Sequence, residues 1–232
     1  MPLKSGYVQA MEAVVASTVP LMKKSGFRKR RHTFNRSREN GVVAVLNFQM
    51  GSSEPPGTYE IPGFKDNLHG TFTVNLGIAF EEMWKIDLSS ASKPFPPFVN
   101  EYECHVRFRL GELMTPNEDV WWPLKGDLDR VGSEVAGLVE RLALPWLDRF
   151  DSRHGVMTAW ERHEPISREG RLALVIAMIY LHEGQLEQGR RTFLEYYRSP
   201  HNRHHIAWLR QLAPQIGIGS LPNIADRGEE PK

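Results

Sequence analysis

The side chains best suited to chemistry in this 232-residue chain are amides and cations spaced two residues apart. Residues at this spacing on a β-strand point to the same face of a sheet. If the strands that carry them are neighbours, their polar side chains converge on one surface. That surface would offer several hydrogen-bond donors and two fixed positive charges, which suits a carboxylate or a phosphate group. The residues concerned are Asn47, Gln49, Asn75, His105, Arg107 and Arg109.

The same residues also have a structural interpretation, because one face of an antiparallel sheet is normally polar and solvated. Asn is depleted in strands, so the presence of Asn47 and Asn75 favours a binding surface. The ordinary interpretation is a solvated face or an internal polar network, and our hypothesis against it is that an anionic ligand or a protein partner binds on this face.

A second group of charges lies between the first predicted helix and the first predicted strand. Its densest part is Arg28, Lys29, Arg30 and Arg31. Such a run could contact phosphates, but it is more often a solvated surface. The formal net charge of the chain is only +1, so no overall field draws it to nucleic acid or to a membrane. We expect a basic patch here, without nucleic-acid binding.

Motifs that name a reaction are missing from the sequence. It contains no GxSxG, no P-loop, no GxGxxG after a strand and no paired CxxC. His201, His204 and His205 are close together, but no HExxH motif or nearby acidic ligand accompanies them. Cys104 falls on the apolar side of a predicted strand, where burial makes a thiol inert. We therefore predict no catalytic residue, no metal ligand and no cofactor. The missing motifs favour a protein that is not an enzyme, but they leave that question open.

The elements that position the polar face follow from hydrophobic spacing and turn residues. Residues 7–24 have helical spacing, and Gly26 is placed to end that helix. The Asn40-Gly41 pair indicates a hairpin. Residues 51–70 form a long excursion rich in Pro and Gly. Strands are predicted over 31–37, 42–50, 71–80 and 103–112.

The second half of the chain is mainly helical. A long helix is predicted over 127–150, with Asp127 as its N-cap and Pro145 as a bend near its end. The adjacent Trp121 and Trp122 are expected to point in opposite directions, one into the core and one partly exposed. The fold class is α+β, with an antiparallel sheet of four or more strands packed by the first and the long helix. Residues 1–150 form this domain, residues 151–224 a helical extension packed on it, and residues 225–232 a disordered tail.

Several separated blocks of the sequence resemble one family. They include Gly26-Phe27-Arg28-Lys29, Leu46-Asn47-Phe48-Gln49, the segments 72–78 and 104–111, and Trp121-Trp122. Together they resemble the bacterial domain-of-unknown-function family numbered forty-three-oh-four, over about residues 5–150. The resemblance implies an α+β fold with a curved antiparallel sheet. It implies no activity and no catalytic residue.

The setting and function follow from these observations. The single cysteine and the absence of a leader-like opening predict a cytoplasmic protein. We expect a non-enzymatic module that binds a protein partner, by analogy with small bacterial domains of the immunity or antitoxin kind. The rival hypothesis is an enzyme or a nucleic-acid-associated protein that uses the Asn, Arg and His face on an anionic substrate.

Overall fold

A computed structural model describes residues 6–51, 67–87, 92–115, 118–167 and 170–221. These residues form two compact units. The first unit combines residues 1–81 with 95–169, and the second combines 82–94 with 170–232. Most of the predicted excursion over 51–70, and the predicted tail over 225–232, lie outside the described residues.

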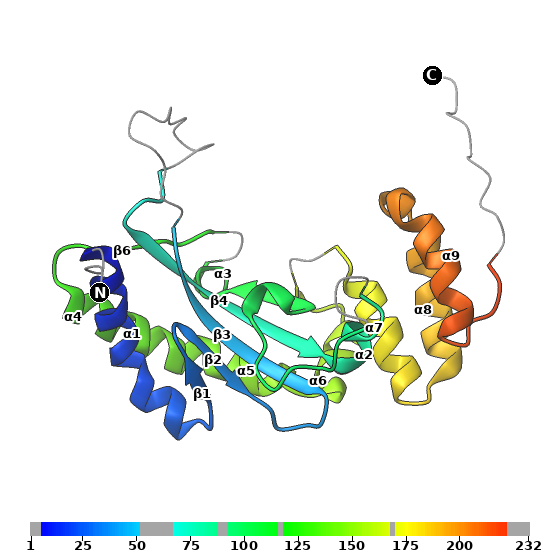
Figure 1. The fold of residues 1–232 in the computed structure, drawn as a ribbon, viewed down its shortest axis with the longest axis horizontal. Coiled ribbons are helices and arrows are strands. Elements are labelled where there is room, and N and C mark those ends of the chain that lie inside the picture. The colour runs from blue at the N-terminus through cyan, green and yellow to red at the C-terminus, as the bar shows by residue number, and fades with distance from the viewer. Residues whose placement is uncertain (1–5, 52–66, 88–91, 116–117, 168–169, 222–232) are drawn as a thin grey trace, which may run out of the picture. The chain divides into compact units, whose positions relative to one another are not determined.

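The first unit is built on one antiparallel sheet of six strands, which confirms the predicted α+β class with a sheet larger than four strands (Figure 1). The strand order is β1-β2-β3-β4-β5, and β6 pairs with another part of β4. The strands are β1 (Arg28–Arg30), β2 (Thr33–Arg36), β3 (Val42–Met50), β4 (Thr71–Phe80), β5 (Val106–Arg109) and β6 (Trp122–Pro123).

The strands differ from the sequence prediction in two places, one an additional strand and the other a strand end. The basic run forms β1, which pairs with β2 through a tight turn where Arg31 has a φ of 54°. A run of charged residues has no apolar alternation, so periodicity does not reveal this strand. The last predicted strand, 103–112, is too long, because β5 ends at Arg109 and Leu110 begins helix α3 (Leu110–Met114).

One face of the sheet is apolar and is covered by helices. Helix α1 (Gly6–Lys24) lies beside helix α4 (Leu128–Leu138) in the first unit (Figure 1). Under them a row of aromatic rings crosses the sheet from Phe34 through Phe48 and Phe72 to Trp122. Gly26 ends α1 as predicted, with a φ of 84° and a hydrogen bond from the Phe27 N–H to the Met22 carbonyl.

The predicted long helix is present but changes its winding near the middle. Asp127 caps α4 as predicted, accepting a hydrogen bond from the Arg130 N–H at 2.9 Å. A π-helical stretch, Val139–Ala143, then leads into α5 (Leu144–Phe150). Pro145 lies in the first turn of α5 and has no N–H to donate. The π-helical winding just before it accommodates the missing hydrogen bond, so the helix continues.

Further elements complete the two units. The first unit also holds a short 3₁₀ turn, η1 (Glu101–Glu103), and helix α6 (Arg153–Glu161). Helix α2 (Glu81–Trp84) spans the boundary between the units. The second unit contains α7 (Leu172–His182), α8 (Leu186–Arg198), a 3₁₀ stretch over Pro200–His205 and α9 (Ile206–Gln215). Among the described residues, no helix is both long enough and apolar enough to cross a membrane.

Candidate binding pocket

The register of the sheet places the predicted polar residues relative to one another. Asn47 lies opposite Thr33 on β2 and opposite Asn75 on β4, and Asn75 lies opposite Arg109 on β5. Directly opposed residues point to the same face, and so do residues two apart on one strand. Asn47, Asn75, Arg107 and Arg109 therefore share one face of one sheet, as the alternation predicts.

Half of this face is not open, because a later segment of the chain crosses it. The residues from Phe95 to Cys104, here called the covering segment, pack Val99 and Cys104 against Val43, Val45 and Ala79. Asn35 holds the segment down, since its side chain donates to the Val99 carbonyl at 3.0 Å and accepts from the Val99 N–H at 2.6 Å. This half of the face is a small second core.

Cys104 belongs to that second core, which corrects one detail of the sequence prediction. The expectation placed it on the apolar side of a strand, in line with Val106. Instead it lies outside β5 and packs on the opposite face, close to Gly77, where an added Cβ would stand 2.6 Å from the Cys104 Sγ. Burial, helped by the charge of Glu101, raises the pKa of the thiol well above its ordinary value. Cys104 is therefore unsuited to act as a nucleophile.

The other half of the face forms a pocket of about 330 Å³ between the sheet and the covering segment. Its floor comes from β2, β3 and β5, and its wall comes from the η1 turn and the residue before it. Tyr102 is 72% exposed, so its ring stands largely in solvent. The lining residues are Thr33, Asn47, Gln49, Asn100, Glu101, Tyr102 and Arg107.

The charges of the pocket are paired inside the domain. Glu101 Oε1 accepts a hydrogen bond from Nε of Arg107 at 2.8 Å and forms an ion pair with its Nη2, also at 2.8 Å. Arg109, the next cation on β5, forms an ion pair with Asp119 and lies over the Trp121 ring at 5.4 Å. Two like charges on one strand are thus neutralised by carboxylates of the same unit, which leaves the pocket polar but close to neutral.

The amides are also paired, in a way that leaves some of their groups for a ligand. Asn47 Nδ2 donates to Thr33 Oγ1 at 2.8 Å, and Asn75 Nδ2 donates to Gln49 Oε1 at 2.7 Å. These bonds fix the side-chain amides and use one atom of each. The side-chain oxygen of Asn47 and the side-chain NH₂ of Gln49 are not used in these two bonds. A ligand could therefore donate to the first and accept from the second at the floor of the pocket.

Three of the predicted binding residues therefore line the pocket, and three do not. Asn47, Gln49 and Arg107 are in the lining, and Arg109 lies outside it beside Asp119. Asn75 is buried beneath Gln49. His105 is buried as well, and its Nδ1 accepts a hydrogen bond from the Phe80 N–H at 3.0 Å, which fixes the end of β4.

Four pocket residues were not predicted from sequence, namely Thr33, Asn100, Glu101 and Tyr102. The last three belong to the covering segment, which begins with a proline-rich stretch and has no periodic pattern. Asn100 begins a capping box with Glu103, and this short motif was the available signal for a structured turn. Trp121 and Trp122 divide as predicted, with Trp122 buried and Trp121 partly exposed.

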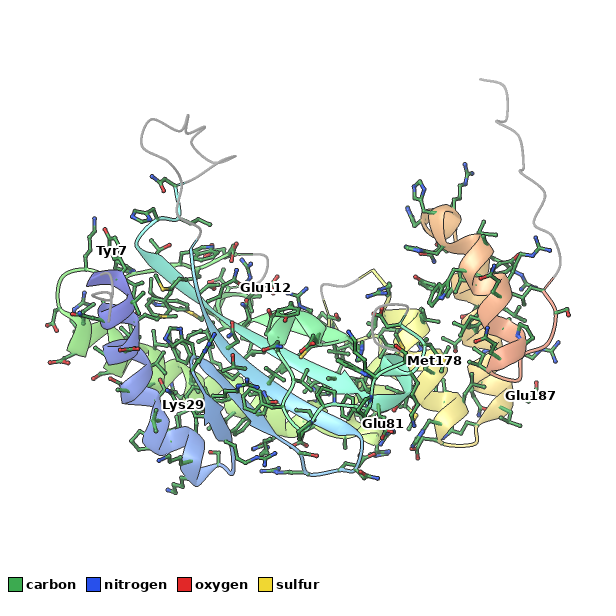
Figure 2. All side chains as sticks on the ribbon, in the orientation of Figure 1. Tyr7, Lys29, Glu81, Glu112, Met178 and Glu187 are labelled. Carbon is green, nitrogen blue, oxygen red and sulfur yellow. The ribbon has the colours of Figure 1, made fainter. Side chains whose placement is uncertain are left out.

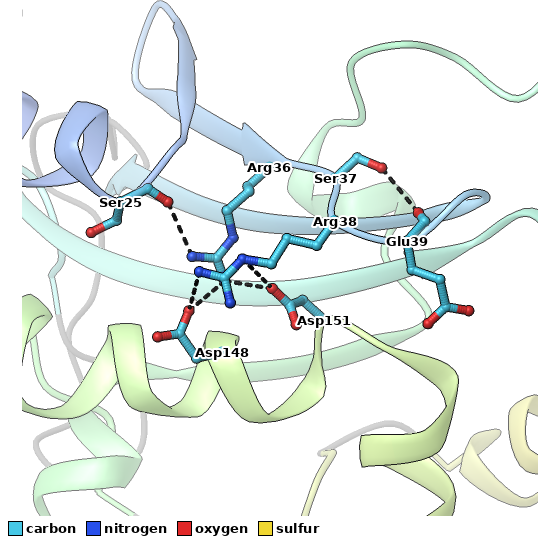
Figure 3. A network of polar contacts seen from close by, with 7 residues as sticks. All are labelled: Ser25, Arg36, Ser37, Arg38, Glu39, Asp148 and Asp151. Carbon is cyan, nitrogen blue, oxygen red and sulfur yellow. Dashed lines mark hydrogen bonds and ion pairs between the residues drawn. The ribbon is translucent and has the colours of Figure 1, made fainter.

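A second charge cluster lies on the helix-covered side of the same sheet (Figure 3). Arg36 Nη2 contacts Asp151 Oδ2 at 2.6 Å and Asp148 Oδ1 at 2.7 Å, and its Nη1 donates to the Ser25 carbonyl at 3.2 Å. Its guanidinium lies 4.4 Å from the centre of the Phe27 ring. The Arg36 side chain is only 4% exposed, so its ion pairs act as a buried structural link between β2 and the end of α5.

The predicted basic patch forms the free edge of the sheet at β1. Arg28, Lys29, Arg30 and Arg31 are all exposed, and Figure 2 labels Lys29 at this edge. The predicted histidine cluster lies on the 3₁₀ stretch before α9. Within the described residues, no group of three or more His, Cys, Asp and Glu side chains is arranged to hold a metal ion.

Comparison with known proteins gives one match. Residues 62–149 match the model of the family described as Domain of unknown function (DUF4304), which confirms the family resemblance over a shorter range than predicted. The matched part includes β4, the covering segment, β5 and α4. No curated protein and no solved structure matched the chain. The family description gives no activity.

Proposed function

We propose that the first unit is a non-enzymatic module that binds a protein partner, with the pocket as its docking point. The observation that carries this proposal is the exposure of Tyr102, which is 72% accessible at a pocket floored by fixed amides. Tyrosine is enriched among residues that dominate binding energies, because it offers a large rigid surface with a polar end. A protein side chain or loop tip entering the pocket would pack against this ring and meet the amides behind it.

The state of the charged groups supports binding more than catalysis. The carboxylate in the pocket, Glu101, is held by two nitrogens of Arg107, so it is committed to an ion pair. A general acid or base must reach and exchange a proton with its substrate. The thiol of Cys104 is buried nearby with a raised pKa, so it offers no nucleophile. The pocket is therefore equipped to recognise a group and poorly equipped to transform one.

Photo-crosslinking in the cells that make the protein tests this proposal. A photoreactive phenylalanine analogue at position 102 should give a discrete crosslinked protein, and Asn47→Ala in the same chain should weaken that crosslink. The matched control places the analogue at Leu186 on α8, which is 65% exposed but far from the pocket in sequence. Equal crosslinking patterns at the two positions, or no effect of Asn47→Ala, would refute the proposal.

A further inference from the structure

The exposed edge of the sheet carries a concentration of positive charge. Arg28, Lys29 and Arg30 make up β1, and Arg31 follows at the tip of the hairpin. All four are exposed, and among the described strands β1 pairs with β2 alone. A sheet edge of this kind presents backbone groups and side chains together to an incoming chain.

These cations differ from the arginines on the sheet faces, which are neutralised internally. Arg36, Arg107 and Arg109 each contact a carboxylate of the first unit. In the part of the chain that the structure describes, no carboxylate pairs with any of the four cations at the edge. Arg28 donates to the Pro97 carbonyl at 3.2 Å, and Arg30 lies 6.0 Å from the Phe98 ring. The positive charge of the edge is therefore available to an external anion.

The edge continues directly into the pocket. Arg30 lies opposite Thr33, and Thr33 lies opposite Asn47, so the three side chains point to the same face on successive strands. Strand neighbours are spaced by about 5 Å, which places Arg30 within about 10 Å of the amide floor. Arg28 points to this face as well, and its bond to Pro97 ties it to the covering segment.

The pattern of charge favours discrete carboxylates over a continuous phosphate chain. Beyond the edge, carboxylates offset the positive charges. Glu101 pairs with Arg107 and Asp119 pairs with Arg109. Glu103 accepts a hydrogen bond from the Asn100 side chain. A nucleic-acid strand that ran from the edge across the pocket would meet these carboxylates with its phosphates. An acidic peptide needs favourable charge only where its own side chains lie.

We propose that the partner presents an extended acidic segment, which lies on the β1 edge against Arg28 and Arg30 and ends in the pocket. This inference rests on the proposed function and specifies the chemistry of the partner. Charges at the rim of an interface mainly change the association rate and its dependence on salt, whereas buried contacts mainly change the dissociation rate. Binding should therefore weaken as ionic strength rises.

A fluorescent peptide of alternating Glu and Thr is the probe, and fluorescence anisotropy on the full chain is the measurement. The peptide should bind, and its Gln-for-Glu counterpart should not. Replacing both Arg28 and Arg30 with Gln should weaken binding by about tenfold or more. The matched control replaces Arg190 and Arg191 on α8, a second pair of exposed arginines outside the first unit, and it should change affinity by less than about twofold.

Three results would overturn the inference. The first is an equal loss of affinity in the two double variants, which would show that the net charge of the chain, and not the position of the arginines, controls binding. The second is tighter binding of an oligouridylate than of the acidic peptide, with the same dependence on Arg28 and Arg30, which would make the edge a nucleic-acid surface. The third is no peptide binding at low salt. In each of these three cases, a crosslink at position 102 that persists in the Arg28 and Arg30 double variant would leave the protein-binding function standing.

Discussion

Arg36 and Arg107 are both arginines held by carboxylates of the first unit, yet the two faces of the sheet use them differently. The Arg36 side chain is 4% exposed and contacts Asp151 and the Ser25 carbonyl (Figure 3). Its guanidinium also lies 4.4 Å from the centre of the Phe27 ring. The Arg107 side chain is 34% exposed and lines a pocket. The residue types and their bonds are alike, so burial and the neighbouring space separate a structural ion pair from one at a binding site.

The largest expected effect comes from breaking the buried pair. Arg36→Gln leaves the Asp151 carboxylate buried without its main partner, and removal of one member of a buried pair typically costs about 3–5 kcal/mol. We expect a loss of that size in the free energy of unfolding, measured by urea denaturation. Arg38→Gln is the matched control, because Arg38 contacts the same two aspartates with a side chain that is 53% exposed.

For Arg38→Gln we expect a loss below about 1 kcal/mol. Equal losses for the two variants would contradict the view that burial makes Arg36 structural.

A smaller effect is expected from the same change in the pocket. Arg107→Gln removes the hydrogen bond and the ion pair to Glu101 and leaves that buried carboxylate with weaker partners. An unsatisfied buried group of this kind costs about 1–3 kcal/mol, and the partial exposure of the site admits water to compensate. Urea denaturation should show a folded variant that is less stable than wild type. A loss as large as that of Arg36→Gln would mean that Arg107 is structural.

The pH dependence of stability sharpens the comparison, because the Asp151 carboxyl is affected by burial. Burial raises its pKa above the ordinary value of 3.8, although Arg36 and Arg38 act in the opposite direction. A carboxyl with a higher pKa in the folded than in the unfolded chain binds its proton more tightly when folded. Its contribution to stability is therefore fully present below 3.8 and is lost as pH rises through the folded-state value.

Thermal melts of wild type and Asp151→Asn across the acid range test this sign. The melting temperature of wild type relative to Asp151→Asn should fall as pH increases. A relative stability that rises with pH would show that the ion pairs outweigh burial.

The smallest stability effect is expected at the pocket rim. Tyr102 is largely exposed and belongs to a short turn, so Tyr102→Ala should change the free energy of unfolding by less than about 0.5 kcal/mol. Urea denaturation measures this directly. A loss above about 1 kcal/mol would indicate that the ring packs against the domain and is not a free contact for a partner.

Sequence alone predicted the parts of this architecture that depend on local periodicity. Alternation placed Asn47, Asn75, Arg107 and Arg109 on one face, because a strand reverses its side chains at every residue. It could not reveal that the covering segment closes half of that face, since Asn35 and Val99 are joined across 64 residues of chain. The pairing of Arg107 with Glu101 depends on the same fold-back. The pocket is therefore a product of tertiary contacts that leave no periodic signal.

The strand β1 was missed for a related reason. Its three residues are all charged and all exposed, so neither hydrophobicity nor alternation identifies it. It is a strand because β2 offers a pairing edge and because Arg31 adopts the positive φ that the turn requires. The charge run itself was evident from sequence, whereas its position beside the pocket was not.

Crosslinking at position 102 in the Arg107→Gln chain tests the central claim most directly, provided that urea denaturation of the same preparation is measured alongside. If the pocket is a binding site separate from the structural cluster at Arg36, this chain unfolds cooperatively with most of its stability, and the crosslink to the partner protein is lost. A folded Arg107→Gln chain that crosslinks as strongly as wild type would contradict the claim.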